Sequence, residues 1–93
     1  MTIDEQRAKK GAIVLDVFKP GWQRRIDLDS MTFRNKKCCI LGQVYGSWDR
    51  GVENVFGGAT GVARRAGFSG RSNAELDRLA RAWARETRNR VAA

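Results

Sequence analysis

Two adjacent cysteines, Cys38 and Cys39, are the residues whose type and position first suggest chemistry. They follow two lysines, whose positive charges can lower the pKa of a thiol. A structural zinc site needs four sulfur or nitrogen ligands, whereas this chain has two thiols and no histidine. A redox pair normally has the C-x-x-C spacing, which adjacent cysteines lack. We therefore expect free thiols, with Cys39 packed near Leu41 and Val44 as a small apolar residue of the core.

The remaining patterns that could support catalysis are weak. Asp27 and Asp29 lie two residues apart, but in a loop such a pair caps the following turn rather than sharing a proton. The serines have no histidine to activate them. Residues 51–70 hold six of the ten glycines without forming a Walker A sequence or a strand-linked G-x-G-x-x-G. The sequence therefore predicts a protein that is not an enzyme and that needs no cofactor or metal.

The charge of the chain is its strongest global feature. With 18 Lys and Arg residues against 10 Asp and Glu residues, the formal net charge is +8 and the pI is about 10.5. Such a charge favours contact with an acidic partner, whether nucleic acid, a membrane surface or an acidic protein. Every basic residue after Lys37 is arginine, which can equally reflect GC-rich coding. No apolar run is long enough to span a bilayer, and the polar start lacks the apolar region of a signal peptide, so we expect a cytosolic protein without membrane insertion.

The elements that must position these residues are predicted to be mainly helical. Thr2 and Glu5 form a capping box, which predicts a helix over about 3–18. The second half of this segment is rich in β-branched residues and also fits a strand. Pro20 is suited to start a further short helix, so the chain is expected to turn just before it.

The middle of the chain has a less regular pattern. A short strand is possible near 26–33, where apolar and polar residues partly alternate. Apolar periodicity then predicts helices near 37–46 and 48–56, interrupted at Gly46. The glycine-rich residues 51–70 are predicted to be the most flexible part of the chain.

The last segment has the clearest helical signal. Ser72 and Glu75 form a second capping box, and no proline or glycine follows, so a helix is predicted over about 73–91. Its apolar and basic residues lie on different sides of the helix. The predicted fold is therefore a small, mainly α-helical, single-domain bundle of about four helices over residues 1–93. Its predicted core consists of Trp22, Ile40, Leu41, Val44, Leu76, Leu79 and Trp83.

The arginines of the C-terminal helix allow three interpretations. They can form a solvated face without a partner, a phosphate-binding face, or a contact for an acidic helix or coiled coil. The chain lacks a helix-turn-helix signature, a zinc finger and an RNA-binding aromatic motif, which favours a protein partner over nucleic acid. We predict a partner-binding surface formed by the glycine-rich loop and the basic side of this helix. It comprises Phe68, Ser69, Gly70, Arg71, Arg78, Arg81, Arg85 and Arg88.

A string of motifs resembles a known set of small proteins. It runs from P-G-W at 20–22 through I-D at 26–27 to L-G-Q at 41–43, with Gly46 following. Over most of residues 11–86 the chain is similar to small proteins encoded by actinobacteriophages, mycobacteriophages included. Many of those proteins carry a C-x-x-C just before the L-G-Q, whereas here Cys39 matches the second cysteine and Lys36 stands at the first.

The resemblance implies a phage product that acts in the host cell cytoplasm. Such proteins frequently bind and disable a host protein, and the sequence is similar to a kind that targets a host DivIVA-type polar-growth scaffold, with superinfection exclusion or host cytotoxicity as the outcome. The departure from C-x-x-C implies that this chain does not bind metal or form a disulfide in the way its relatives would. The alternative function is that of a small basic nucleic-acid-binding protein.

Overall fold

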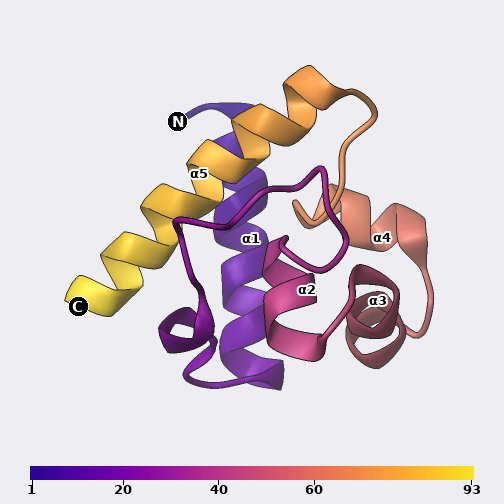
Figure 1. The fold of residues 1–93 in the computed structure, drawn as a ribbon, viewed down its shortest axis with the longest axis horizontal. Helices are drawn as coiled ribbons and strands as arrows, with labels where there is room; N and C mark the ends of the chain where they lie inside the picture. Colours follow the sequence, from indigo (N-terminus) through magenta and orange to yellow (C-terminus); the bar gives the residue numbers. More distant parts are fainter.

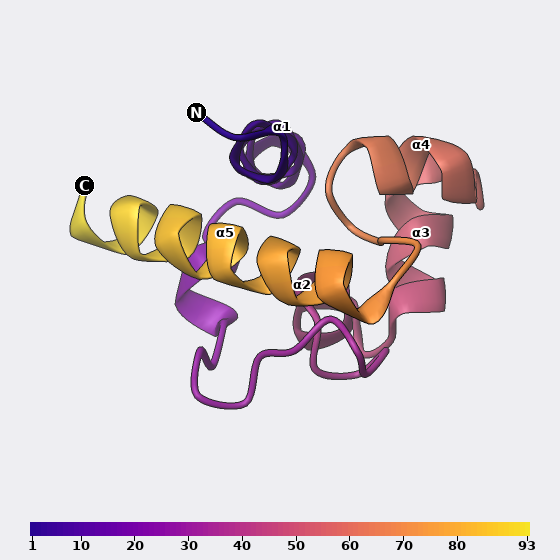
Figure 2. The same ribbon diagram turned by 90° about the horizontal axis from the view of Figure 1, so that it is seen from above.

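Five α-helices and one short 3-10 helix, joined without any β-strand, make up the computed structural model, which describes all residues from 1 to 93 (Figure 1). The elements are α1 (Ile3–Phe18), η1 (Trp22–Arg25), α2 (Ile40–Tyr45), α3 (Trp48–Phe56), α4 (Thr60–Arg65) and α5 (Asn73–Ala92). The predicted mainly α-helical fold with a long C-terminal helix is confirmed, with five helices in place of about four. Helices α3 and α4 lie together at the end of the molecule away from the C-terminus (Figures 1 and 2).

Helix α1 begins where its capping box predicts. The Oγ1 atom of Thr2 accepts the backbone N–H of Glu5 at 3.1 Å. The helix continues through the β-branched segment, which is therefore not a strand. Packing explains this outcome, because Ala8, Ala12 and Leu15 are fully buried at helical spacing, and an extended chain would not place all three on one face.

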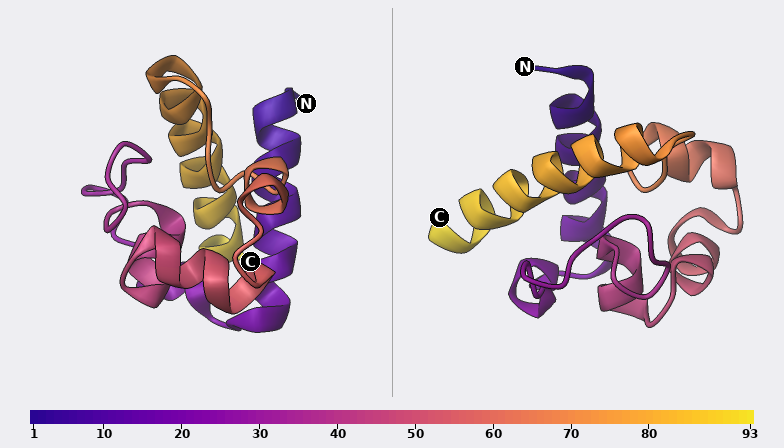
Figure 3. Two further views of the ribbon diagram at one scale, coloured as in Figure 1. Left: turned by 90° about the vertical axis from the view of Figure 1, so that its right-hand side faces the viewer. Right: turned by 45° about the horizontal axis from the view of Figure 1, so that its top comes forward.

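Helix α5 crosses α1 at a steep angle (Figure 2 and the right-hand view of Figure 3). The indole of Trp83 on α5 is fully buried against α1. The Nε1 atom of Trp83 donates to the carbonyl of Gly67 at 2.6 Å, and its ring meets Trp22 edge-on at 5.6 Å. A Cβ atom at Gly11 would lie 2.3 Å from the carbonyl oxygen of Ala66 and 2.6 Å from the Trp83 ring. The crossing therefore requires glycine at this position of α1.

Helix α2 starts later than its predicted boundary of 37 because Cys39 caps it. Cys39 has extended backbone, and its Sγ atom accepts the N–H of Gly42 at 3.3 Å. A Cβ atom at Gly42 would lie 2.3 Å from the carbonyl oxygen of Lys36, so the turn before the helix packs directly onto it. The helix ends at Gly46, as predicted, where φ is +96°.

The possible strand near 26–33 is absent, and turns occupy the segment. The side chain of Gln43 takes the place of a strand partner: it accepts the N–H of Asp27 at 2.6 Å and donates to the carbonyls of Asp27 and Cys38 at 3.1 and 2.9 Å. The Oδ1 atom of Asp27 also accepts the N–H of Asp29 at 3.1 Å, which confirms the predicted cap on this turn.

Helix α4 lies inside the glycine-rich segment and was not predicted. Its Ala63 is fully buried, and the carbonyl of Ala63 accepts the N–H of Phe68 at 3.0 Å. Of the six glycines in this segment, Gly57 and Gly58 form the turn between α3 and α4, where both have positive φ, whereas Gly51 and Gly61 lie inside helices.

The predicted core is largely correct. Six of its seven residues are buried, whereas Leu76 is half-buried and packs against the cluster from the first turn of α5. The buried six are Trp22, Ile40, Leu41, Val44, Leu79 and Trp83.

Candidate functional site

The eight residues of the predicted partner-binding surface lie in different environments, and the first of them is not at the surface. Phe68 is only 1% exposed, and its ring lies 5.1 Å from that of Trp83. The chain passes so close to α1 at Gly67 that a Cβ atom there would lie 2.7 Å from the backbone of Arg7, and Phe68 consequently enters the core. Phe68, expected at the contact surface, is instead a residue of the buried core in this structure.

Ser69 and Gly70 line a groove of about 200 Å³. The half-buried side chains of Trp48 and Leu76 contribute apolar surface to it. The indole Nε1 of Trp48 donates to the carbonyl of Phe68 at 2.8 Å, which fixes the loop against α3. This part of the predicted surface is therefore a groove with a partly apolar lining, next to a loop that is hydrogen-bonded to α3.

The four arginines of α5 divide into two pairs. Arg78 forms an ion pair with Asp4 at 3.1 Å, and Arg85 lies 3.7 Å from Glu5. Both carboxylates belong to the first turn of α1, where the helix dipole also favours negative charge. Arg81 and Arg88 are exposed and form no ion pair, although the charge of Arg81 also acts on Asp77, the partner of Arg34. Together with Arg71, they are the members of the predicted surface that form no ion pair within the chain.

A second ionic contact joins α1, α4 and α5 through Arg7. Its guanidinium donates to the carbonyls of Arg64 and Ser69 and to Glu75, whose Oε2 atom lies 2.6 Å away. The other carboxylate oxygen of Glu75 accepts the backbone N–H of Arg71 at 2.7 Å. The Arg71 hydrogen bond, followed by that from Arg7, holds the pKa of Glu75 below its ordinary value. Arg7 therefore acts as a structural clamp.

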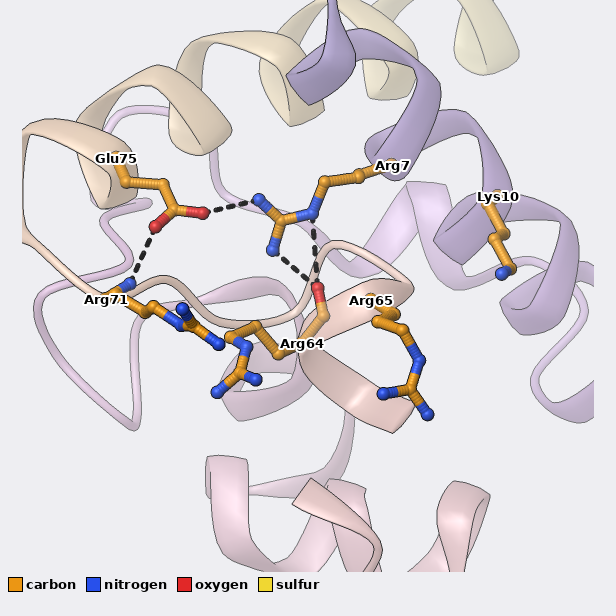
Figure 4. Close-up of a pocket in the computed structure, with 6 residues that line it drawn as sticks. All are labelled: Arg7, Lys10, Arg64, Arg65, Arg71 and Glu75. Atoms are coloured by element: carbon orange, nitrogen blue, oxygen red, sulfur yellow. Dashed lines mark hydrogen bonds and ion pairs between the residues drawn. The ribbon is translucent and has the colours of Figure 1, made fainter. Parts of the chain in front are cut away.

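A concave basic surface lies beside this clamp and was not predicted as a unit (Figure 4). Besides Arg71, it contains Lys10 from α1 and Arg64 and Arg65 from the end of α4. The adjacent arginines at 64 and 65 are visible in the sequence as a charge run. Their proximity to Lys10 depends on the hydrogen bond from Arg7 to the carbonyl of Arg64 and on the close approach of Gly67 to α1, which no local pattern reveals.

The cysteines differ in their environments. Cys39 is 2% exposed and belongs to the same buried cluster as Leu41 and Val44, as predicted. Burial raises the pKa of its thiol, so the sulfur is protonated at neutral pH. Cys38 is half-exposed, and neither cysteine is in a disulfide. The structure contains no group of three or more His, Cys, Asp or Glu residues placed to hold a metal ion.

More positive than negative side chains are left without an ion-pair partner. Six of the eighteen Lys and Arg side chains form ion pairs with a carboxylate, which leaves twelve without one. Among the carboxylates, only Asp27, Asp29 and Glu53 are unpaired. The positive charge of the surface is therefore not neutralised within the molecule.

No protein-family model, curated protein or solved structure matches this chain. None of its helices combines the length and the apolar character that crossing a membrane requires.

Proposed function

We propose that this chain is a phage-encoded, non-catalytic binding protein that docks on an acidic host protein and inhibits it. The observation that carries the proposal is the exposed arginine face of α5, where Arg81 and Arg88 form no ion pair within the chain. An arginine fork pairs well with a carboxylate of a second protein, and complementary charge of this kind speeds and orients encounter.

The spacing of the arginines supports a helical partner. Residues 78, 81, 85 and 88 alternate steps of three and four, so that two pairs are separated by seven residues each. Seven residues of helix span about 10.5 Å. Carboxylates at equivalent positions of successive heptads in a coiled coil recur at nearly the same distance. The arginine face therefore matches an acidic coiled coil in register.

The resemblance to small actinobacteriophage proteins narrows the choice of partner further. It implies a host DivIVA-type polar-growth scaffold, in the host cell cytoplasm, with superinfection exclusion or host cytotoxicity as the outcome. Such a scaffold is an acidic coiled coil and fits the charge and the spacing of the α5 face. The groove beside Ser69 and Gly70 offers apolar contact area that charges alone do not provide.

Binding of a designed coiled-coil peptide tests this proposal. The peptide carries glutamate at one surface position of each heptad, and a second peptide of identical composition has those glutamates out of register. We expect the in-register peptide to bind more tightly, and the double substitution R81E/R88E to weaken it by about tenfold or more, since two ion pairs become repulsions.

The matched control is R24E/R25E, which makes the same change in net charge at two exposed, unpaired arginines of η1. Reversal of Arg78 and Arg85 is less informative, because it also removes the contacts of α5 with Asp4 and Glu5. Equal weakening by the R81E/R88E and R24E/R25E variants, or equal binding of the two peptides, would refute a specific α5 contact.

The alternative is a nucleic-acid-binding protein, favoured by the net charge of +8 and the twelve cations without a carboxylate partner. Neutralisation of phosphates releases counterions, so such binding weakens steeply with salt. A titration with duplex DNA and with single-stranded RNA at two salt concentrations separates the two functions. Absence of binding at low salt would remove the alternative.

A further inference from the structure

Four cations without a carboxylate partner surround one hollow of about 590 Å³ (Figure 4). Lys10 comes from α1, Arg64 and Arg65 from the last turn of α4, and Arg71 from the loop before α5. These residues lie as much as 61 positions apart in the chain, so that only the fold brings them together. No apolar side chain lines the hollow.

The acid at the edge of the hollow does not neutralise these cations. Both carboxylate oxygens of Glu75 are already engaged, one by the side chain of Arg7 and the other by the backbone N–H of Arg71. The guanidinium of Arg7 donates in turn to Glu75 and to two backbone carbonyls, and its side chain is 15% exposed. Arg7 and Glu75 together carry no net charge, whereas the other four lining side chains keep their positive charges.

Local effects account for only part of the cluster. Positive side chains at the end of α4 interact favourably with the helix dipole, which suits Arg64 and Arg65. The dipole does not account for Lys10 or the Arg71 side chain, which come from other elements. Like charges gathered in one place repel one another unless an anion lies among them.

We propose that this hollow binds a compact polyphosphate group, that is, two or three linked phosphates, either free or as the tail of a nucleotide. Three arginine forks and one ammonium group match the several closely spaced oxygens of such a chain. No aromatic or aliphatic side chain lines the hollow to stack on a base, so the proposed contacts are with the phosphates alone. Arg81 and Arg88 do not line this hollow, so it is separate from the contact proposed for α5.

Isothermal titration with sodium tripolyphosphate tests the site. We expect one saturable site in the wild-type chain, weakened about tenfold or more in the K10Q/R65Q variant, because each charged contact to phosphate contributes appreciably. Neither substituted side chain makes a hydrogen bond within the fold, so the variant should unfold at the same temperature as the wild type. The R24Q/R25Q variant removes the same charge on η1 and should bind as the wild type does.

Competing anions define the ligand class. Adenosine triphosphate should bind as tightly as tripolyphosphate, and citrate, a compact tricarboxylate, should bind more weakly. Equal losses in the K10Q/R65Q and R24Q/R25Q variants would overturn the proposal, as would equal affinity for citrate. An isotherm for tripolyphosphate without a saturable site would overturn it as well.

Discussion

Replacement of Arg7 by leucine should destabilise the fold more than any other change at the ionic surface. The side chain joins three segments: it contacts Glu75 from α5 and the carbonyls of Arg64 and Ser69 on either side of the loop after α4. The side chains of Arg7 and Glu75 are 15% and 21% exposed, so both ions are largely removed from water. Leucine would remove one donor from the carboxylate and from each carbonyl, although Glu75 would keep the N–H of Arg71 and the carbonyl of Arg64 would keep the N–H of Gly67.

The magnitude follows from this burial. Loss of one partner from a fully buried ion pair costs about 3–5 kcal/mol, and the residual exposure of both side chains lowers our expectation to about 2–3 kcal/mol. For a domain of this size, that corresponds to a fall in the melting temperature of about 10–20 °C. Urea denaturation followed by tryptophan fluorescence measures the change in the free energy of unfolding.

Lys10→Leu is the matched control for Arg7→Leu, because Lys10 lies on the same helix, is exposed and forms no ion pair. Its cost should stay within about 0.5 kcal/mol. Arg7→Lys should also lose most of the stabilisation, since one ammonium does not reproduce the geometry of the guanidinium fork. The clamp would be refuted if Arg7→Leu cost no more than Lys10→Leu, or if Arg7→Lys were as stable as the wild type.

Three further predictions concern packing, pH and thiol reactivity. Gly11→Ala should cost about 2 kcal/mol in urea denaturation, because its methyl group would meet a backbone carbonyl and an indole ring, whereas Gly61→Ala on α4 has room for a Cβ and should not destabilise. Because the pKa of Glu75 is lowered in the folded state, its ionised carboxylate stabilises the fold at neutral pH, and this contribution is lost as the pH falls below about 4.5. The melting temperature of Glu75→Gln should therefore fall less than that of the wild type when the pH is lowered through this range. Parallel curves of melting temperature against pH for variant and wild type would contradict this. Cys38 should react with a thiol reagent well before Cys39, whose burial raises its thiol pKa, and equal rates by mass spectrometry would contradict the packing of Cys39.

The starts of the two long helices could be predicted because the signals that mark them are local. The capping boxes at Thr2 and Ser72 place the starts of α1 and α5 at the residues where the structure has them. The start of α2 was misplaced because a cysteine serves as its cap, and Cys is not among the residues that normally identify one. Helix α4 was missed because its stability derives from burial of Ala63 rather than from its own glycine-flanked sequence.

The candidate site was harder to predict than the fold. Periodicity places the four arginines of α5 on one face, but it does not reveal that two of them meet carboxylates more than seventy residues earlier in the chain. Likewise, Phe68 looks like an exposed loop residue until the approach of Gly67 to α1 directs it inward. Charge pairing and loop burial of this kind depend on tertiary contacts, which a single sequence does not specify.

Affinity capture from actinobacterial host cells, with the wild-type chain, the R81E/R88E variant and the R24E/R25E variant as baits, tests the proposed function most directly. The capture is performed from lysates with and without nuclease treatment, and mass spectrometry identifies the bound proteins. We predict that the wild type and R24E/R25E retain the same acidic coiled-coil protein and that R81E/R88E loses it. Retention of that protein by R81E/R88E, or capture that disappears on nuclease treatment, would contradict a protein-binding function of the α5 face.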